Sequence, residues 1–403
     1  MLIVQKFGGT SVGDLECIQN VANRIAQTVA QGHTVVAVVS AMSGETNKLV
    51  SYAEHFSDNP VRAEVDMLLS SGERVTASLL AIALNEMGHK ATSMTGRRAG
   101  ILTNSWHTKA RIEHIDPTIM HTALDDGNII VVAGFQGIAE DGRVTTLGRG
   151  GSDLSAVAIA GALKADLCEI YTDVKGIYTT DPRIEPNARK IDKISYDEML
   201  ELASLGAKVL QTRSVEMAKK LNVNLVTRSS FSNAEGTLIT NEEDIMEQAL
   251  VSGIALDKNQ ARVSMRGVVD RPGIASDIFT ALAKSGVNVD MIIQTVGYDG
   301  TTHLGFTVPT TEIGDAKNIV QIFIDNNEVQ EAEYDDSICK VSVVGVGMKS
   351  HTGVAAKGFS TMADENINIM MISTSEIKIS MIIEEKYAEL AVRSLHSTYE
   401  LEK

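Results

Sequence analysis

The sequence has few cysteines, no excess of positive charge and no signature of a nucleic-acid binder. Its three cysteines, Cys17, Cys168 and Cys339, are far apart and show no paired spacing. This pattern indicates neither a disulfide framework nor a zinc site, and we expect no dedicated metal site. The 36 Lys and Arg residues are outnumbered by 52 Asp and Glu residues, and the net charge is −16 at pH 7. A surface this acidic repels a phosphate backbone, so we expect no nucleic-acid partner.

Export and membrane signals are also missing from the sequence. The apolar residues at the start are soon interrupted by Lys6 and two glycines, so we expect no signal peptide. No apolar stretch approaches the length of a membrane span, so we expect no membrane partner and a cytoplasmic location. The 403 residues are 44% apolar and 22% charged, which is typical of a globular protein with two or three domains.

The common phosphate-binding motifs are absent too, because the chain contains neither G-x-x-x-x-G-K-[ST] nor G-x-G-x-x-G. An unusual alternative stands at the start, where an apolar run ends in Lys6, Phe7, Gly8, Gly9, Thr10 and Ser11 before a helix-like segment. Glycines let a backbone approach a ligand closely, a helix start presents free N–H groups, and a lysine adds positive charge. The segment therefore predicts a place to hold phosphate.

Up to about residue 240, strand-like and helix-like segments alternate, which predicts a three-layer α/β domain with a mainly parallel sheet. In such sheets ligands bind beyond the carboxyl ends of the strands. The expected strands are Leu2–Phe7, Thr34–Ser40, Ile129–Phe135, Leu167–Thr172 and Asn224–Arg228, and the expected helices are Cys17–Gln31, Glu64–Met87, Leu154–Leu163, Tyr196–Leu205 and Val215–Leu221.

The last third of the chain contains an internal repeat. Gly273-Ile274-Ala275 is followed by Asn288, and Gly353-Val354-Ala355 is followed by Asn368, at an offset of 80 residues. Each copy predicts a β-α-β-β-α-β order, with a second strand within Val287–Ile292 or Ile367–Ile372, and this order is the ferredoxin-like arrangement. We therefore expect a catalytic domain over 1–240, a linker and first regulatory strand over 241–262, and two small domains over 263–335 and 336–403.

Five polar clusters lie at expected strand ends or turns of the first domain. Each one alone has a structural explanation as a turn or helix cap, at about even odds or better. Together, the glycine loops with Lys, Arg and Asp suit anions and an ammonium group, which is the equipment of phosphoryl transfer. The clusters are residues 6–11, 40–46, 70–74, 148–153 and 172–183.

Four of these segments match a known family. KFGGTSV (6–12), SSGER (70–74), GRGGSD (148–153) and YTDVKGIYTTDPR (171–183) resemble the amino-acid kinase family and, within it, the aspartate kinases. The resemblance extends over the whole chain, because aspartate kinases carry two C-terminal ACT domains, which the repeat matches. The length is similar to that of the monofunctional class. The implied reaction transfers the γ-phosphoryl group of ATP to the side-chain carboxylate of L-aspartate, giving 4-phospho-L-aspartate, the first step of lysine, threonine and methionine biosynthesis.

The resemblance also implies roles for individual residues. Lys6 is expected to bridge ATP and the acceptor, and Asp153 to organise the active site. The acceptor carboxylate is already ionised at neutral pH, so no strong base is required. Mg²⁺ is expected to arrive with ATP. The implied aspartate pocket is Ser40, Thr46, Glu73, Arg149, Gly150, Gly151 and Ser152, and the implied nucleotide residues are Lys6, Phe7, Gly8, Gly9, Thr10, Ser11, Thr172, Asp173, Tyr178, Asp181, Arg183 and Lys208. Gln211 departs from the family, in which many members have His.

ACT domains imply feedback control by lysine, threonine or both, and a homo-oligomer formed through these domains. An alternative is that the glycine and asparagine turns only build the fold. The implied effector residues are Asp270, Gly273, Ile274, Ala275, Asn288, Asp290 and Gln294 in the first copy, and Gly353, Val354, Asn368 and Ile369 in the second.

Two other functions remain open at this point. The chain could be another amino-acid kinase, acting on glutamate, acetylglutamate or uridylate, although Glu73, Arg149 and the double repeat favour aspartate. It could also be a catalytically silent amino-acid sensor, although a silent copy has no need for Lys6, Glu73, Arg149 and Asp153 together.

Overall fold

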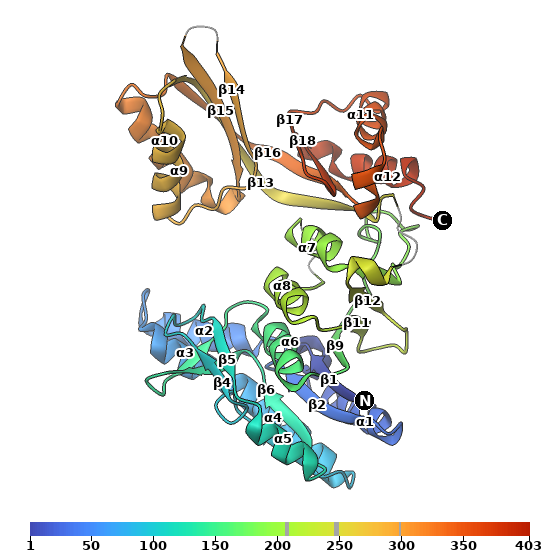
Figure 1. Cartoon of the computed structure of the whole chain (residues 1–403). Helices are drawn as coiled ribbons and strands as arrows, with labels where there is room; N and C mark the ends of the chain where they lie inside the picture. Colours follow the sequence, from blue (N-terminus) through green and yellow to red (C-terminus); the bar gives the residue numbers. More distant parts are fainter. Residues whose placement is uncertain (206–208, 246–249, 298–299) are drawn as a thin grey trace. The chain divides into compact units, whose positions relative to one another are not determined.

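The structure is a computed structural model of residues 1–403, and it describes residues 1–205, 209–245, 250–297 and 300–403 (Figure 1). The chain forms two compact units. The first unit comprises Met1–Ile177, Lys190–Ala203 and Lys208–Glu247, and the second comprises Tyr178–Arg189, Ser204–Ala207 and Gln248–Lys403. Residues Tyr178–Arg189, which we assigned to the catalytic domain from the sequence, thus cluster with the C-terminal part of the chain.

An eight-stranded sheet is the centre of the first unit. All neighbouring strands are parallel except β11 and β12, which are antiparallel. This confirms the mainly parallel sheet expected from the sequence. In spatial order the strands are β10 (Lys193–Ser195), β12 (Thr237–Thr240), β11 (Leu225–Ser229), β9 (Leu167–Thr172), β1 (Leu2–Phe7), β2 (Thr34–Val39), β6 (Ile129–Ala133) and β3 (Ala91–Met94).

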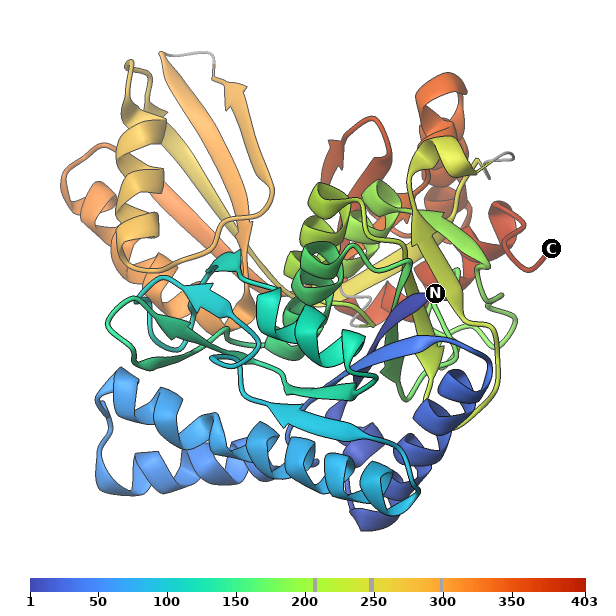
Figure 2. The same ribbon diagram turned by 60° about the horizontal axis from the view of Figure 1, so that its bottom comes forward.

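Helices cover both faces of this sheet, so the unit has the expected three layers. Alternate residues of β2 pack in one core with α1 and α4, whereas α6 contacts β1, β2 and β9 on the other face and packs on α8. In Figure 2 the light-blue helices α2 and α3 run beside each other. The helices are α1 (Leu15–Ala30), α2 (Glu45–Phe56), α3 (Arg62–Leu69), α4 (Ser71–Glu86), α5 (Thr118–Asp125), α6 (Gly151–Leu163), α7 (Tyr196–Ser204) and α8 (Thr212–Leu221).

The helical stretch expected over Glu64–Met87 is confirmed, with one interruption at Ser70 that divides it into α3 and α4. At this interruption, the Ser70 carbonyl accepts hydrogen bonds from the side chains of Gln136 (3.0 Å) and Arg74 (3.2 Å). The combined stretch Arg62–Glu86 does have the length and composition of a membrane span, contrary to our expectation. Half of its apolar window is buried inside the protein, as in a core helix.

A second, four-stranded sheet in the first unit was not expected from the sequence. Its strands have only three or four residues, too short to show an alternating pattern. Their order is β5 (Ile112–Ile115), β4 (Ile101–Thr103), β7 (Gln136–Ala139) and β8 (Val144–Thr146), with β4 and β7 parallel.

The second unit is built on one antiparallel six-stranded sheet. Two long strands, β13 and β16, pair along their length and run through both halves of the sheet. The second strands of the repeat begin later than expected, at Ile292 and Met371. The order is β14 (Ile292–Val296), β15 (Thr301–Val308), β13 (Gly253–Val269), β16 (Glu331–Val344), β18 (Lys378–Glu384) and β17 (Met371–Thr374).

Two helices pack on each half of this sheet, as the repeat predicts, and each half has its own core. Residues 178–189 are attached to the second half. The backbone N–H of Ile254 donates to the Thr179 carbonyl (2.7 Å), and the Thr179 hydroxyl lies 2.9 Å from Nε2 of buried His396. The helices are α9 (Ile274–Lys284) and α10 (Ile313–Asp325) in the first half, and α11 (Val354–Asp364) and α12 (Ala388–Thr398) in the second.

Candidate active site

A cavity of about 460 Å³ lies in the first unit where β1, β2 and β9 end and where α4 and α6 begin. This is the edge at which a parallel sheet of this type binds ligands. The structure brings together residues from all five predicted clusters. Those that line the cavity are Lys6, Gly8, Gly9, Thr10, Ser40, Thr46, Glu73, Arg149, Gly150, Gly151, Ser152, Asp153 and Thr172.

Lys6 and Asp153 form an ion pair within this cavity. Lys6 is near the end of β1, and Asp153 is in the first turn of α6. The Lys6 Nζ lies 2.6 Å from Asp153 Oδ1, and both side chains are about nine-tenths buried. Oδ1 has no other partner among the described residues. Asp153 thus holds the lysine ammonium at the strand end, and the ammonium has three N–H groups, so donors remain for a ligand.

Glu73 is a buried carboxylate with one oxygen unsatisfied. Its Oε1 accepts a hydrogen bond from the backbone N–H of Ala41 (3.1 Å), at the end of β2. Its Oε2 is buried and has no partner among the described residues. Burial raises the pKa of the Glu73 carboxyl to about 7. A buried anion without a cation is costly, so this position favours a ligand that brings a positive charge.

Arg149 supplies the opposite charge at the same cavity. It is exposed and makes no hydrogen bond or ion pair with any residue that the structure describes. Gly148 and Gly150 on either side have φ of 78° and 71°, in the left-handed region that favours glycine. A Cβ on Gly150 would lie 2.0 Å from the side chain of Gln211. Gln211, where many members of the family have His, therefore packs against the loop that carries Arg149.

The two glycines after β1 allow close approach between neighbouring strand ends. A Cβ on Gly8 would lie 3.3 Å from the Lys6 Nζ, and one on Gly9 would lie 3.2 Å from the Ala41 carbonyl oxygen. The Gly8 N–H donates to the Tyr171 carbonyl (3.2 Å), so it is already used within the chain. These glycines therefore have a packing role in addition to any ligand contact.

Several predicted nucleotide residues lie elsewhere. Phe7 is fully buried and stacks on Tyr171 with ring centroids 4.8 Å apart. Ser11 is also buried, and its hydroxyl lies 2.5 Å from that of Ser230. Asp173 is exposed outside the cavity. Tyr178, Asp181 and Arg183 belong to the second unit, and Lys208 lies outside the described residues.

Sequence analysis missed Phe135 and Tyr171 among the residues that line the cavity. Phe135 has a φ of 68°, rare for a residue with a side chain, and its backbone N–H donates to the hydroxyl of Ser155 (3.1 Å). Phe135 occurs at the end of an expected strand and outside the five polar clusters, and neither Gly134 nor Gln136 beside it marks a ligand site. Ile170 and Val209 also line the cavity outside the predicted clusters, whereas Ala41, Met42, Ser43, Gly44 and Gly148 lie within those clusters but were given no role.

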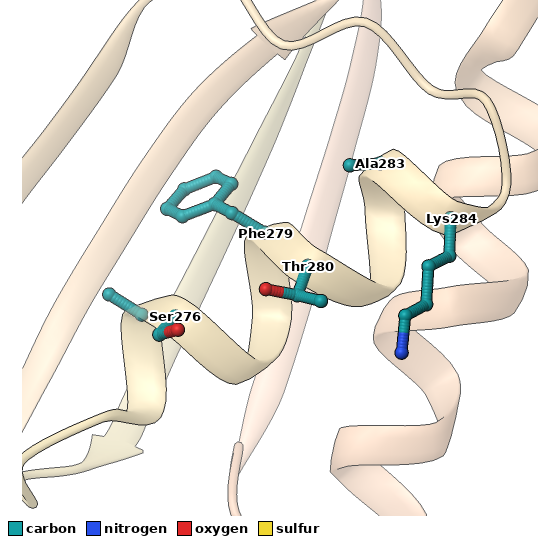
Figure 3. Close-up of a pocket in the computed structure, with 6 residues that line it drawn as sticks. Ser276, Phe279, Thr280, Ala283 and Lys284 are labelled. Carbon is teal, nitrogen blue, oxygen red and sulfur yellow. The ribbon is translucent and has the colours of Figure 1, made fainter.

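The predicted effector turns in the second unit are largely satisfied by the chain itself. Gly273 and Gly353 precede α9 and α11 with φ of 96° and 89°, and the following Ile274 and Val354 are core residues. A shallow hollow of about 580 Å³ follows one side of α9, where Ser276, Phe279, Thr280 and Ala283 succeed one another (Figure 3). Of the predicted residues, Ala275 alone is in the lining of this hollow.

The turn after α9 carries two more predicted residues. The backbone N–H of Asn288 donates to the Glu312 carboxylate (2.6 Å), and Asp290 forms an ion pair with buried Lys340 of β16. Asp270, Gln294 and Asn368 are exposed, and Ile369 packs against the core of the second half.

Models of known protein families match segments of both units. Residues 1–228 match the model of the amino acid kinase family, and residues 261–324 and 341–399 each match an ACT domain model. The aspartokinase of Helicobacter pylori strain 26695 is 60% identical over 407 aligned positions that cover all of both chains.

Two solved structures of E. coli aspartokinase III are also similar, each at 27% identity over 99% of both chains. One is a complex with aspartate and ADP, described as the R-state, with a TM-score of 0.80. The other is a complex with lysine and aspartate, described as the T-state, with a TM-score of 0.78.

Proposed function

Since this chain belongs to the amino acid kinase family and, within it, to the aspartate kinases, we propose that it converts L-aspartate and ATP to 4-phospho-L-aspartate and ADP. The observation that carries this proposal is the pair of unpaired opposite charges, Glu73 and Arg149, in the cavity that also contains Lys6 and Asp153. The ammonium and α-carboxylate of an amino acid complement these two charges, and a second carboxylate on its side chain is then free to accept the phosphoryl group.

The aspartate is held at both charged ends. Its ammonium group pairs with Glu73, whose Oε2 lacks a donor, and its α-carboxylate pairs with the guanidinium of Arg149 through two parallel hydrogen bonds. The ammonium also offsets the cost of ionising a carboxyl whose pKa is about 7 without ligand. The side-chain carboxylate then extends toward Lys6.

In the transfer step, a side-chain carboxylate oxygen of aspartate forms a bond to the γ-phosphorus of ATP as the bond to the β,γ-bridging oxygen breaks and ADP leaves. The nucleophile is already an anion, so no proton needs to be removed. Lys6 stabilises the negative charge on the moving phosphoryl group, and Asp153 orients Lys6 through their 2.6 Å ion pair. Gly9 and Thr10 are our candidates for N–H and hydroxyl donors to the phosphates.

Mg²⁺ is part of the proposal as a companion of the nucleotide. Among the described residues there is no group of three His, Cys, Asp or Glu side chains that could hold a metal ion alone. A hard cation of this kind commonly binds through substrate phosphates with few protein ligands.

Regulation by lysine, threonine or both through the ACT domains is the second part of the proposal. The lysine complex of E. coli aspartokinase III supports it, as does the position of residues 178–189. This segment carries predicted nucleotide residues and is attached to His396 of the second ACT half. The resemblance gives this segment nucleotide contacts, so we expect an effector bound to this half to change the KM for ATP.

A homo-oligomer through the ACT domains is expected as well. The edge strands β14 and β17 expose apolar side chains, among them Ile292, Val296 and Ile372. Exposed apolar edge strands are suited to pairing with a second copy. We place the enzyme in the cytoplasm, at the first step of lysine, threonine and methionine synthesis.

One assay tests the reaction and its alternatives. ADP release from ATP is measured with L-aspartate, L-glutamate, acetylglutamate and uridylate as separate acceptors, with and without lysine plus threonine. Of the four acceptors, we expect only L-aspartate to support ADP release, and we expect lysine plus threonine to inhibit this release. Release with another acceptor contradicts the substrate assignment, and effector binding without any ADP release indicates the silent sensor.

A further inference from the structure

A fully buried carboxylate, Asp66, lies outside the cavity and is not used in the reaction described above. It is on α3 and is 0% exposed. Three groups converge on it: the Thr146 hydroxyl (2.5 Å), the Thr108 backbone N–H (3.0 Å) and Nδ1 of His107 (2.6 Å). These partners are 41 to 80 residues away along the chain. No Lys or Arg forms an ion pair with Asp66 among the described residues.

The partners of Asp66 lead directly to Arg149. Thr146 ends β8, three positions before Arg149, and its carbonyl accepts the N–H of Ala110 (2.9 Å). Thr108 has a φ of 68°, and its carbonyl oxygen would be 3.2 Å from a Cβ on Gly148. The loop that carries Arg149 therefore rests on the backbone that Asp66 holds in a rarely populated conformation.

The helix of Asp66 leads to Glu73. The Asp66 carbonyl accepts the N–H of Ser70 (3.0 Å), at the point where α3 ends and α4 begins. Glu73 is in the first turn of α4. Asp66 thus connects the start of α4, which carries Glu73, with the loop that carries Arg149.

Stability alone gives a weak reason for this arrangement. A buried carboxylate must be desolvated, and an apolar side chain of similar size often stabilises a core as well or better. What the carboxylate adds is direction, because it fixes a hydroxyl, a backbone N–H and an imidazole at once.

We propose that Asp66 is a positioning residue that holds Glu73 and Arg149 at a fixed place relative to Lys6 in the same cavity, and that this placement selects an acceptor of the length of aspartate. The inference rests on the proposed function. The α-ammonium and α-carboxylate have the same geometry in aspartate and glutamate, so the selected quantity is the distance from these groups to the side-chain carboxylate that receives the phosphoryl group.

The test is steady-state ADP release by the full chain with Asp66→Asn, which keeps the shape and removes the charge. We expect the KM for aspartate to rise about tenfold or more, while the KM for ATP stays within about twofold. We also expect the preference for L-aspartate over L-glutamate, as a ratio of kcat/KM values, to fall. Asp116→Asn is the matched control, because Asp116 is an exposed carboxylate in the same unit that accepts a hydrogen bond from the Thr118 backbone N–H. It should change neither the KM for aspartate nor the preference for L-aspartate over L-glutamate.

Thr146→Val provides a second variant if Asp66→Asn does not fold, since it removes one donor to Asp66 with little change of shape. It should raise the KM for aspartate in the same direction by a smaller factor. The inference is overturned if a folded variant keeps the wild-type aspartate KM, or if the two KM values rise together, as a loosened fold would make them. Wild-type protein that releases no ADP with aspartate would instead refute the proposed function.

Discussion

The catalytic cavity and the ACT turns differ in what their polar groups have left to bind. In the cavity, Glu73 has a buried oxygen without a donor and Arg149 has no partner among the described residues. In the first ACT half, Asp290 is already paired with Lys340, and the Asn288 N–H with Glu312. The cavity therefore has charged groups that are free to bind a ligand. In the turn, a ligand can bind these groups only if their present contacts with Lys340 and Glu312 are broken.

The predicted cavity residues are therefore stronger candidates for ligand binding than the predicted residues of the ACT turns. An unpaired buried charge is costly and points to a missing ligand. A satisfied turn is equally compatible with a purely structural role. Variants in the cavity should therefore change catalysis without effectors, and variants in the turn should change the response to effectors.

The largest effect is expected for Lys6→Ala. Removal of the charge that stabilises the moving phosphoryl group should lower kcat by about 100- to 1,000-fold. Lys220→Ala, an exposed lysine on α8, is the matched control and should leave kcat unchanged. A folded Lys6→Ala variant with near-normal ADP release contradicts the role of Lys6.

A smaller loss is expected for Arg149→Lys, which keeps the charge and removes the planar pair of donors. The KM for aspartate should rise by about 30- to 100-fold, with the KM for ATP nearly unchanged, because a charge-assisted pair of hydrogen bonds is lost. Equal changes in both values would place Arg149 outside the acceptor site.

The pH dependence of kcat/KM for aspartate isolates Glu73. Its pKa is about 7 in the free enzyme, so the carboxylate that binds the ammonium is formed as pH rises through 7. We expect kcat/KM to fall to about one-tenth of its plateau at pH 6. Glu73→Gln should be poorly active and should lose this step, and an identical profile in that variant would contradict the assignment.

The smallest effect on turnover is expected in the ACT turn. Asp290→Asn should leave kcat without effectors within about twofold and raise the lysine or threonine concentration for half-inhibition by about tenfold. Asp336→Asn, exposed on β16, is the matched control. An unchanged effector response would favour the structural reading of this turn.

Much of the cavity could be predicted because its residues follow strong local signals. β1 ends in Lys6 and two glycines, and Asp153 follows a glycine loop at the start of α6, so each residue could be placed at a strand end or helix start, where a parallel sheet binds its ligand. Ser11 is not in the lining of the cavity and its hydroxyl lies 2.5 Å from that of Ser230, so its contact with phosphate stays a prediction. Its distant partner left no local trace in the sequence.

The support of the site could not be predicted for the same reason. The strands β4 and β8 have three residues each, and the carbonyl of Ser70, where the helix is divided, accepts a hydrogen bond from the distant side chain of Gln136. Asp66 resembles any helix carboxylate until the fold brings Thr146 and His107 to it. Phe135 gave no signal because its importance is in its backbone angle.

The most direct test of the central claim is the number of protons released when aspartate binds at pH 7, from calorimetric titrations in buffers of different ionisation enthalpy. Aspartate's ammonium should lower the pKa of Glu73 below about 7, so about half a proton should leave per aspartate bound. Glu73→Gln should release none at aspartate concentrations that saturate it. Binding of aspartate to the wild type without proton release, or with the same release in Glu73→Gln, would contradict the claim that Glu73 waits for the acceptor's ammonium.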